Sequence, residues 1–206
     1  MTGGSIGGIV FPLVYQALIP KIGFPWACRI VGFIQLALVI PGNFLIRCRL
    51  KPTRDSKGSI DLVSLLDPIF GLTTLGVFLT EFGIFVPIGY LTSYVIFAGI
   101  DSAFAYQILA IFNAGSVFGR WLPNMLADWV GRFNMMIITM MFCSGTVLGL
   151  WLPASPDKGM MVALAVLYGF GSGAVLGLTP VCVGQICRTE DYGKRYGTCY
   201  FIASFA

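Results

Sequence analysis

Residues 68–97 read PIFGLTTLGVFLTEFGIFVPIGYLTSYVIF, thirty consecutive residues in which Glu81 is the only acidic or basic side chain. A helix of this length is about 45 Å long, which is more than the roughly 30 Å of hydrocarbon in a bilayer. Asp67 and Pro68 open the stretch, a pair typical of an N-cap followed by the first helical residue. The stretch therefore predicts a transmembrane helix that begins at Pro68.

Similar apolar blocks lie on both sides of this stretch. The chain is 57% apolar and only 11% charged, whereas about 25% of the residues in soluble domains are charged. The blocks predict spans at 3–19, 27–46, 68–97, 103–127, 133–152 and 160–186, with a last apolar stretch at 198–206. Nine residues extend about 13 Å, so we expect the chain to end within a helix. We predict an all-α, polytopic membrane protein with six full spans and part of a seventh.

The basic residues between these blocks predict the orientation of the chain. They cluster after the second, fourth and sixth predicted spans, at Arg47, Arg49, Lys51, Arg54, Lys57, Arg132, Arg188, Lys194 and Arg195. The connections after the first, third and fifth predicted spans contain few basic residues. Because positive residues mark the cytoplasmic side, the first span is predicted to run outward from the cytoplasm. The polar stretch 47–66 is predicted to be a cytoplasmic linker between two helical bundles.

The composition also excludes several kinds of site. The chain contains no histidine, which excludes histidine metal ligands, histidine general bases and Ser-His or Cys-His nucleophile pairs. Its six cysteines include no C-x-x-C pair. We therefore expect no enzymatic activity, no metal site and no cofactor. The net charge is +4, and most of the basic residues lie in connections between predicted spans. Because this placement is typical of a membrane protein, we expect a lipid bilayer as a partner and no nucleic acid.

Glu81 and Arg120 lie well inside predicted spans, where a charge is unfavourable and therefore points to function. Arg120 lies eight residues before Asp128, and Glu81 lies 14 residues after Asp67. Our hypothesis is that Arg120 faces a central water-filled cavity and binds an anionic substrate, with Glu81 near it. The alternative is structural: an ion pair between helices, or an arginine that extends to the inner surface.

Glycines crowd the predicted span 160–186, at Gly169, Gly171, Gly173 and Gly177. Part of this run superficially looks like a phosphate-binding loop, but it lies within an apolar helix and no strand precedes it. Glycines allow the backbones of membrane helices to approach closely. We therefore expect these residues to pack helix against helix.

Residues 124–132 read NMLADWVGR and resemble the G-x-L-A-D-x-x-G-R loop of the major facilitator superfamily, with Asn124 in place of the first glycine. The resemblance implies a cytoplasmic latch formed by Asp128 and Arg132. It also makes the predicted span before this loop the eighth of twelve. Residues 1–46 would then be the last two spans of an N-terminal bundle, 47–66 the central linker, and 67–206 a C-terminal bundle truncated in its fifth span.

Three further stretches, 4–12 (GSIGGIVFP), 23–29 (GFPWACR) and 180–197 (PVCVGQICRTEDYGKRYG), are similar to fungal monocarboxylate-transporter-like permeases. That family has an arginine in span eight that engages the substrate carboxylate, and Arg120 matches it. The acidic residue expected one turn earlier, for proton coupling, is replaced by Ser116.

The resemblance implies a solute transporter that works by alternating access in the plasma membrane. The substrate would be a monocarboxylate or a related organic metabolite, driven by its own gradient or by a coupled proton. The alternative is a truncated fragment that transports nothing, or an accessory membrane protein.

Overall fold

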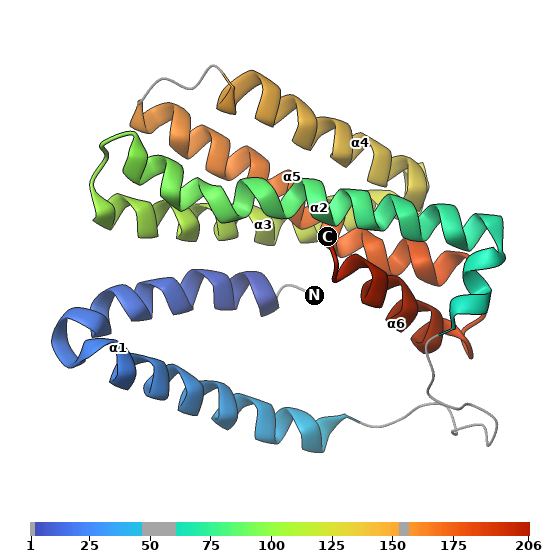
Figure 1. The fold of residues 1–206 in the computed structure, drawn as a ribbon, viewed down its shortest axis with the longest axis horizontal. Helices are drawn as coiled ribbons and strands as arrows, with labels where there is room; N and C mark the ends of the chain where they lie inside the picture. The colour runs from blue at the N-terminus through green and yellow to red at the C-terminus, as the bar shows by residue number, and fades with distance from the viewer. Residues whose placement is uncertain (1–2, 47–60, 153–156) are drawn as a thin grey trace.

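The computed structural model describes residues 3–46, 61–152 and 157–206, which form helices joined by short turns (Figure 1). This confirms the predicted all-α class for the described residues. In chain order the elements are α1 (Gly3–Leu45), η1 (Leu62–Leu66), α2 (Pro68–Phe97), α3 (Ser102–Val130), α4 (Arg132–Thr146), η2 (Val147–Trp151), α5 (Lys158–Gln185) and α6 (Tyr192–Ala203). η1 is a 3₁₀ turn, and η2 continues α4 as a π turn.

Four of the described helices are long and apolar enough to cross a membrane: α1, α2, α4 together with η2, and α5. The 43 residues of α1 would extend about 65 Å if straight, twice the thickness of a hydrocarbon core. Instead α1 folds back at Gly23, whose backbone angles are φ 77° and ψ 161°. Only glycine adopts this conformation without strain. The connection predicted between 19 and 27 is therefore a one-residue break, and its two limbs form a V (Figure 1).

The predicted boundaries agree with the structure where cap residues signal them. α2 begins at Pro68 and ends at Phe97, as predicted, and the Asp67 carboxylate accepts a hydrogen bond from the Ile69 N–H at 3.2 Å. α6 begins at Tyr192, six residues before the predicted apolar stretch. Its first turns carry Lys194, which suits a helix end at the membrane surface but lowers the apolar signal.

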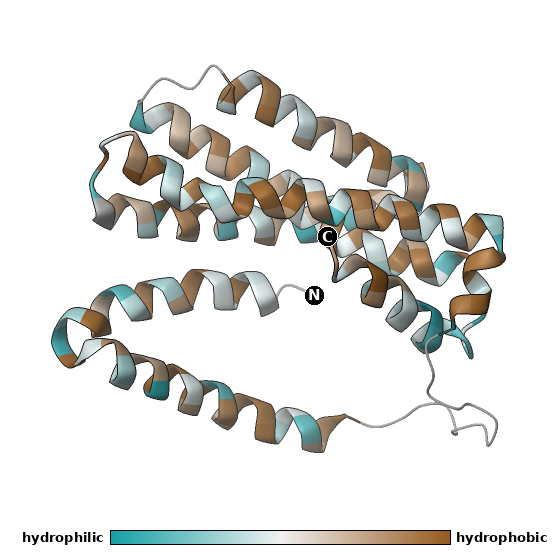
Figure 2. Cartoon of the chain, viewed as in Figure 1, coloured by the Kyte–Doolittle hydropathy of each residue, from teal (hydrophilic) through white to brown (hydrophobic). Residues whose placement is uncertain are grey.

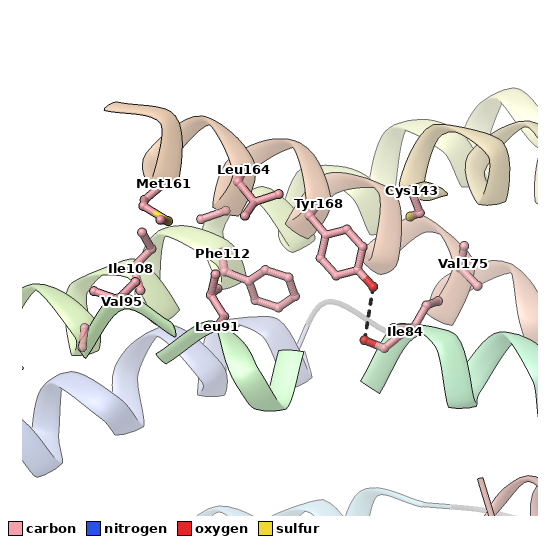
Figure 3. Packing of buried hydrophobic residues seen from close by; sticks show 12 residues of the cluster. Ile84, Leu91, Val95, Ile108, Phe112, Cys143, Met161, Leu164, Tyr168 and Val175 are labelled. Carbon is pink, nitrogen blue, oxygen red and sulfur yellow. Dashed lines mark hydrogen bonds between the residues drawn. The ribbon is translucent and has the colours of Figure 1, made fainter. Parts of the chain in front are cut away.

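α5 lies at the centre of the bundle, against α3 and α4 and in contact with α2 and α6 (Figure 1). Buried side chains of α2, α3 and α5 form the main core, where the Tyr168 hydroxyl donates to the Ile84 carbonyl at 3.2 Å (Figure 3). Large apolar residues are also exposed along α2, α4 and the second limb of α1, where much of the ribbon has hydrophobic colours (Figure 2). Such faces are expected of helices that contact lipid or further helices.

Glycines on both helices allow the close crossing of α3 and α5. A methyl group on Gly119 would overlap the Phe170 carbonyl oxygen, and one on Gly169 would overlap the Phe112 carbonyl oxygen. A methyl group on Gly173 would lie 2.5 Å from the Ser116 carbonyl oxygen. Two helices thus meet backbone to backbone through glycines of each, which confirms the packing role predicted for the glycine cluster of α5.

Candidate functional site

The first limb of α1 packs against α3 through small and polar residues. The Ser5 and Ser116 hydroxyls are 3.1 Å apart and buried. A methyl group on Gly4 would lie 3.3 Å from an Arg120 guanidinium nitrogen, and one on Gly8 would overlap the Asn113 amide. Later residues of α1 therefore contact earlier residues of α3, so the two helices are antiparallel. Arg120 lies at this interface, with its guanidinium against the α1 backbone.

Ser116 occupies the position where the resemblance led us to expect an acid. Its hydroxyl contacts Ser5, and its backbone carbonyl lies against Gly173 of α5. A carboxylate side chain would have to fit between two helices that already touch. The serine at this position is consistent with close packing of α3 on α1 and α5.

Glu81 lies in α2 with only 4% of its surface exposed. The Tyr200 hydroxyl of α6 donates a long hydrogen bond of 3.4 Å to its Oε1. No ion pair of the described residues joins Glu81 to Arg120. The structure therefore places Tyr200 of α6 beside Glu81, and Arg120 at the contact of α3 with α1.

Sequence analysis missed Tyr200, although a signal was present. Tyr192, Tyr196 and Tyr200 recur every four residues and so share one face of α6. Their rings form a ladder with centroid distances of 5.5 Å and 4.6 Å. The ladder runs from the start of α6, the end that the basic residues predict to be cytoplasmic, to Glu81.

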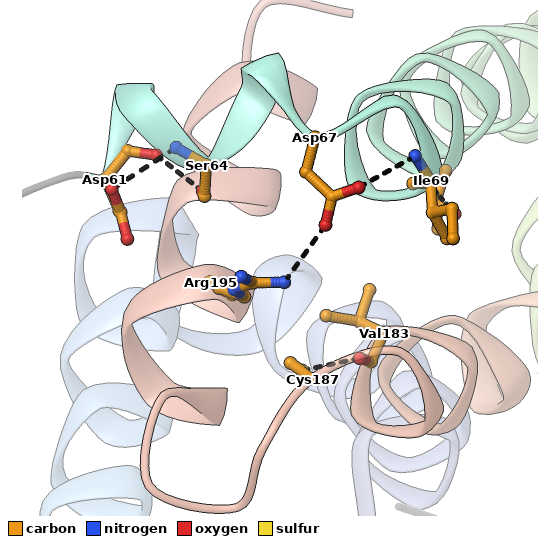
Figure 4. A network of polar contacts seen from close by, with 8 residues as sticks. Asp61, Ser64, Asp67, Ile69, Val183, Cys187 and Arg195 are labelled. Atoms are coloured by element: carbon orange, nitrogen blue, oxygen red, sulfur yellow. Dashed lines mark hydrogen bonds and ion pairs between the residues drawn. The ribbon is translucent and has the colours of Figure 1, made fainter.

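The start of α6 is held by the end of the predicted linker. Lys194 pairs with the Asp61 carboxylate at 3.2 Å, and the Asp61 N–H donates to the Thr198 hydroxyl at 2.9 Å. Arg195 pairs with Asp67 at 3.8 Å (Figure 4). These contacts join the residues just before α2 to the first turns of α6. Residues 47–60 of the linker lie outside the described residues.

The Arg195 side chain also affects its apolar surroundings. Its guanidinium lies 5.4 Å from the centre of the Phe70 ring. Burial raises the pKa of the Cys187 thiol, and the positive charge of Arg195 partly opposes this. The thiol is therefore neutral near pH 7, consistent with its hydrogen bond to the Val183 carbonyl at 2.7 Å (Figure 4).

The two residues of the predicted latch lie where α3 meets α4. Asp128 and Arg132 form an ion pair of 3.7 Å across Gly131, with 68% and 39% of their side chains exposed. Gly131 has a φ of 98°, which turns the chain between the two helices. The pair joins successive helices, and its role as a conformational latch stays a prediction.

A cavity of about 690 Å³ lies elsewhere, between α2 and α4. Its lining is mainly apolar and includes Met136, Met140 and Met141. Neither Glu81 nor Arg120 lines it. It is therefore not the cavity that we predicted for an anionic substrate.

Comparisons with known proteins identify a family model and several relatives of the chain. The sequence profile described as "Major Facilitator Superfamily" matches residues 1–206. The chain is 38% identical over 199 residues to "MFS-type transporter opdF" of Penicillium oxalicum, covering 96% of this chain and 47% of that protein.

Two further relatives are similar over nearly the whole chain. It is 34% identical over 226 residues to "Riboflavin transporter MCH5" of Saccharomyces cerevisiae, which covers 98% of this chain and 43% of that protein. It is 35% identical over 208 residues to "Aspyridones efflux protein apdF" of Emericella nidulans, which covers 100% of this chain and 42% of that protein. The chain thus spans about half the length of the curated relatives it matches. No solved structure matches it.

Proposed function

The chain belongs to the major facilitator superfamily, and from this premise we propose that it forms part of a transporter that carries a small organic anion by alternating access. Relatives named as transporters and efflux proteins support a transporter rather than an enzyme. Apolar helices long enough to cross a bilayer support an integral membrane protein. We propose the plasma membrane as its location.

The proposal assigns the elements to two bundles. Residues 1–46 would supply the last two spans of an N-terminal bundle, 47–66 the central linker, and 67–206 the C-terminal bundle. The full count would be six spans, with α6 starting a seventh. Two observations support this: the fold of α1 into two limbs at Gly23, and the 29 residues of α3, enough to cross a bilayer. Asp128 and Arg132 would form the cytoplasmic latch.

Arg120 carries the proposal. It is a cation placed well inside an apolar helix, where the contact of α1 with α3 brings the two proposed bundles together. In alternating access the site lies between two bundles that rock about it. A guanidinium there binds carboxylates with two parallel hydrogen bonds. Glu81, the second residue proposed for the site, lies buried in α2 and accepts a hydrogen bond from Tyr200.

The substrate class follows from this chemistry and from the relatives. The guanidinium favours a monocarboxylate or another organic anion. Relatives named for riboflavin and for aspyridones widen the class to larger metabolites. Pyruvate and riboflavin are therefore suitable probes of the two ends of the range.

The test measures binding of each probe to the purified chain in lipid nanodiscs, and uptake by liposomes that contain it. Arg120→Gln should weaken anion binding by about 10- to 150-fold, the loss of a charged hydrogen bond. The affinity of Arg120→Lys for the anion should lie between those of Arg120→Gln and the wild type. Arg29→Gln, an exposed arginine stacked on Trp26, is the matched control.

Equal binding by Arg120→Gln and the wild type would remove Arg120 from the site. If a probe binds but no uptake follows, the alternative holds, and the 206-residue chain acts as a fragment or accessory protein.

A further inference from the structure

The face of α3 that packs against α1 carries three polar side chains. Asn113, Ser116 and Arg120 recur at intervals of three and four residues, so they form one row along this face. Gly8 of α1 lies opposite the Asn113 amide. Gly4, one turn earlier in α1, lies opposite the Arg120 guanidinium. Because α1 and α3 belong to the two proposed bundles, the row faces the space that opens when these bundles separate.

The serine and the asparagine of this row bond differently. The Ser116 hydroxyl bonds across the interface to the Ser5 hydroxyl at 3.1 Å, and both residues are buried. The Asn113 amide instead donates to the Leu109 carbonyl of its own helix at 2.9 Å. Its oxygen accepts no hydrogen bond from the described residues and keeps part of its surface accessible. A polar atom within an apolar helix is unfavourable unless a partner bonds it, so this oxygen is suited to bond a ligand.

The amide oxygen and the guanidinium lie about one helical turn apart. Residues four apart on a helix have Cβ positions separated by roughly 5–6 Å, which applies to the methyl groups that Gly4 and Gly8 lack. An Arg120 nitrogen lies 3.3 Å from the position of the first methyl group, and the Asn113 amide overlaps the second. The two polar groups are therefore spaced along α1 so that one extended molecule can contact both.

We propose that Asn113 is a specificity-determining residue of the anion site. Arg120 binds the carboxylate of the substrate, and the Asn113 oxygen accepts a hydrogen bond from an O–H or N–H roughly 6 Å away. The inference rests on the proposed transport function and narrows its substrate class to organic anions that carry such a donor. Pyruvate has no O–H or N–H at neutral pH and leaves the amide oxygen without a bond. Metabolites with a hydroxyl or an N–H at this spacing bond both residues.

The first experiment compares two acids that differ by one hydroxyl. Binding of valerate and of δ-hydroxyvalerate to the purified chain in lipid nanodiscs is measured by calorimetry. The wild type should bind the hydroxy acid about 2- to 12-fold more tightly, the usual effect of one neutral hydrogen bond. In Asn113→Leu, which nearly conserves the side-chain volume, this preference should disappear. Gln107→Leu, which replaces an exposed amide of the same helix, is the matched control and should keep it.

The ratio of the two affinities separates substrate binding from packing. A merely structural Asn113 would change both affinities equally, and the ratio would stay as in the wild type. Equal affinities for the two acids in the wild type, or a preference that persists in Asn113→Leu, would overturn the proposal.

A second variant displaces the same oxygen from the α1 side. The methyl group of Gly8→Ala would overlap the Asn113 amide, so the preference for the hydroxy acid should fall as in Asn113→Leu. Gly3→Ala, whose methyl group would meet nothing within 4 Å, should keep the preference. An unchanged preference in Gly8→Ala would also overturn the proposal, and this variant decides the matter if Asn113→Leu does not fold.

Failure of the inference and failure of the transport function give different results. If Arg120→Gln loses pyruvate binding while Asn113→Leu keeps the preference for the hydroxy acid, Asn113 is removed from the site and the proposed function stands. If the wild type binds neither acid nor pyruvate, the anion site fails, and the role of Asn113 fails with it.

Discussion

Replacement of Gly119 by alanine tests the closest contact of the bundle. The new methyl group would overlap the Phe170 carbonyl oxygen. Because this oxygen belongs to the backbone of α5, no side-chain rotation can relieve the overlap, and the two helices must move apart. That movement would also loosen the contacts of Gly169 and Gly173 at the same crossing.

The magnitude follows from two opposing effects. Overpacking a well-packed site destabilises by about 1–3 kcal/mol, and a rigid backbone neighbour places Gly119 near the upper value. Alanine stabilises a helix relative to glycine by about 1 kcal/mol. The free energy of unfolding should therefore fall by roughly 2 kcal/mol in Gly119→Ala.

The matched control is Gly76→Ala, because no atom lies within 4 Å of the position of its methyl group. This variant keeps the helix gain without the overlap, so its free energy of unfolding should rise by up to about 1 kcal/mol. Both are measured by circular dichroism as sodium dodecyl sulfate unfolds the purified chain in mild detergent. Equal stability of the two variants would refute the packing of α3 on α5 through glycines.

Two further predictions concern the backbone and the linker. Gly23→Ala should lower the free energy of unfolding by about 1–3 kcal/mol, because φ 77° and ψ 161° suit glycine alone. The control is Gly32→Ala, whose methyl group would meet nothing within 4 Å, and equal stability of the two variants would contradict the fold of α1. A double-mutant cycle of Asp61→Asn and Lys194→Gln should give a coupling energy of about 0.2–1 kcal/mol, as for partly exposed ion pairs. A coupling of zero would show that this pair does not hold α6.

The sequence predicts the helices well because a bilayer limits the backbone conformations that a chain can adopt within it. Every backbone group in hydrocarbon must be bonded within a helix, so apolar length alone predicts a span. The Asp67-Pro68 pair adds the cap that fixes where α2 begins. Apolar length does not predict a helix boundary outside the hydrocarbon, where water can bond the backbone. One such boundary is Tyr192, where α6 begins among charged residues at the proposed membrane surface.

The site is predicted less completely than the fold. A charge in an apolar span stands out, so Arg120 and Glu81 are visible in the sequence. Their mutual position depends on how α2, α3 and α6 pack, which no local pattern encodes. Tyr200 is a common residue at the end of an apolar stretch, and only the packing of α6 on α2 gives it a partner.

The two sets of contacts on α6 act on one short helix. Thr198 bonds the Asp61 backbone, and Tyr200, two residues further on, bonds Glu81. Their Cα atoms differ by about 3 Å along the helix axis. A helix of this length moves as a unit, so a shift that separates Tyr200 from Glu81 must also strain the contact of Thr198 with Asp61. The contact of Tyr200 with Glu81 and the attachment of the linker to α6 are therefore not independent, and a change at one should be measurable at the other.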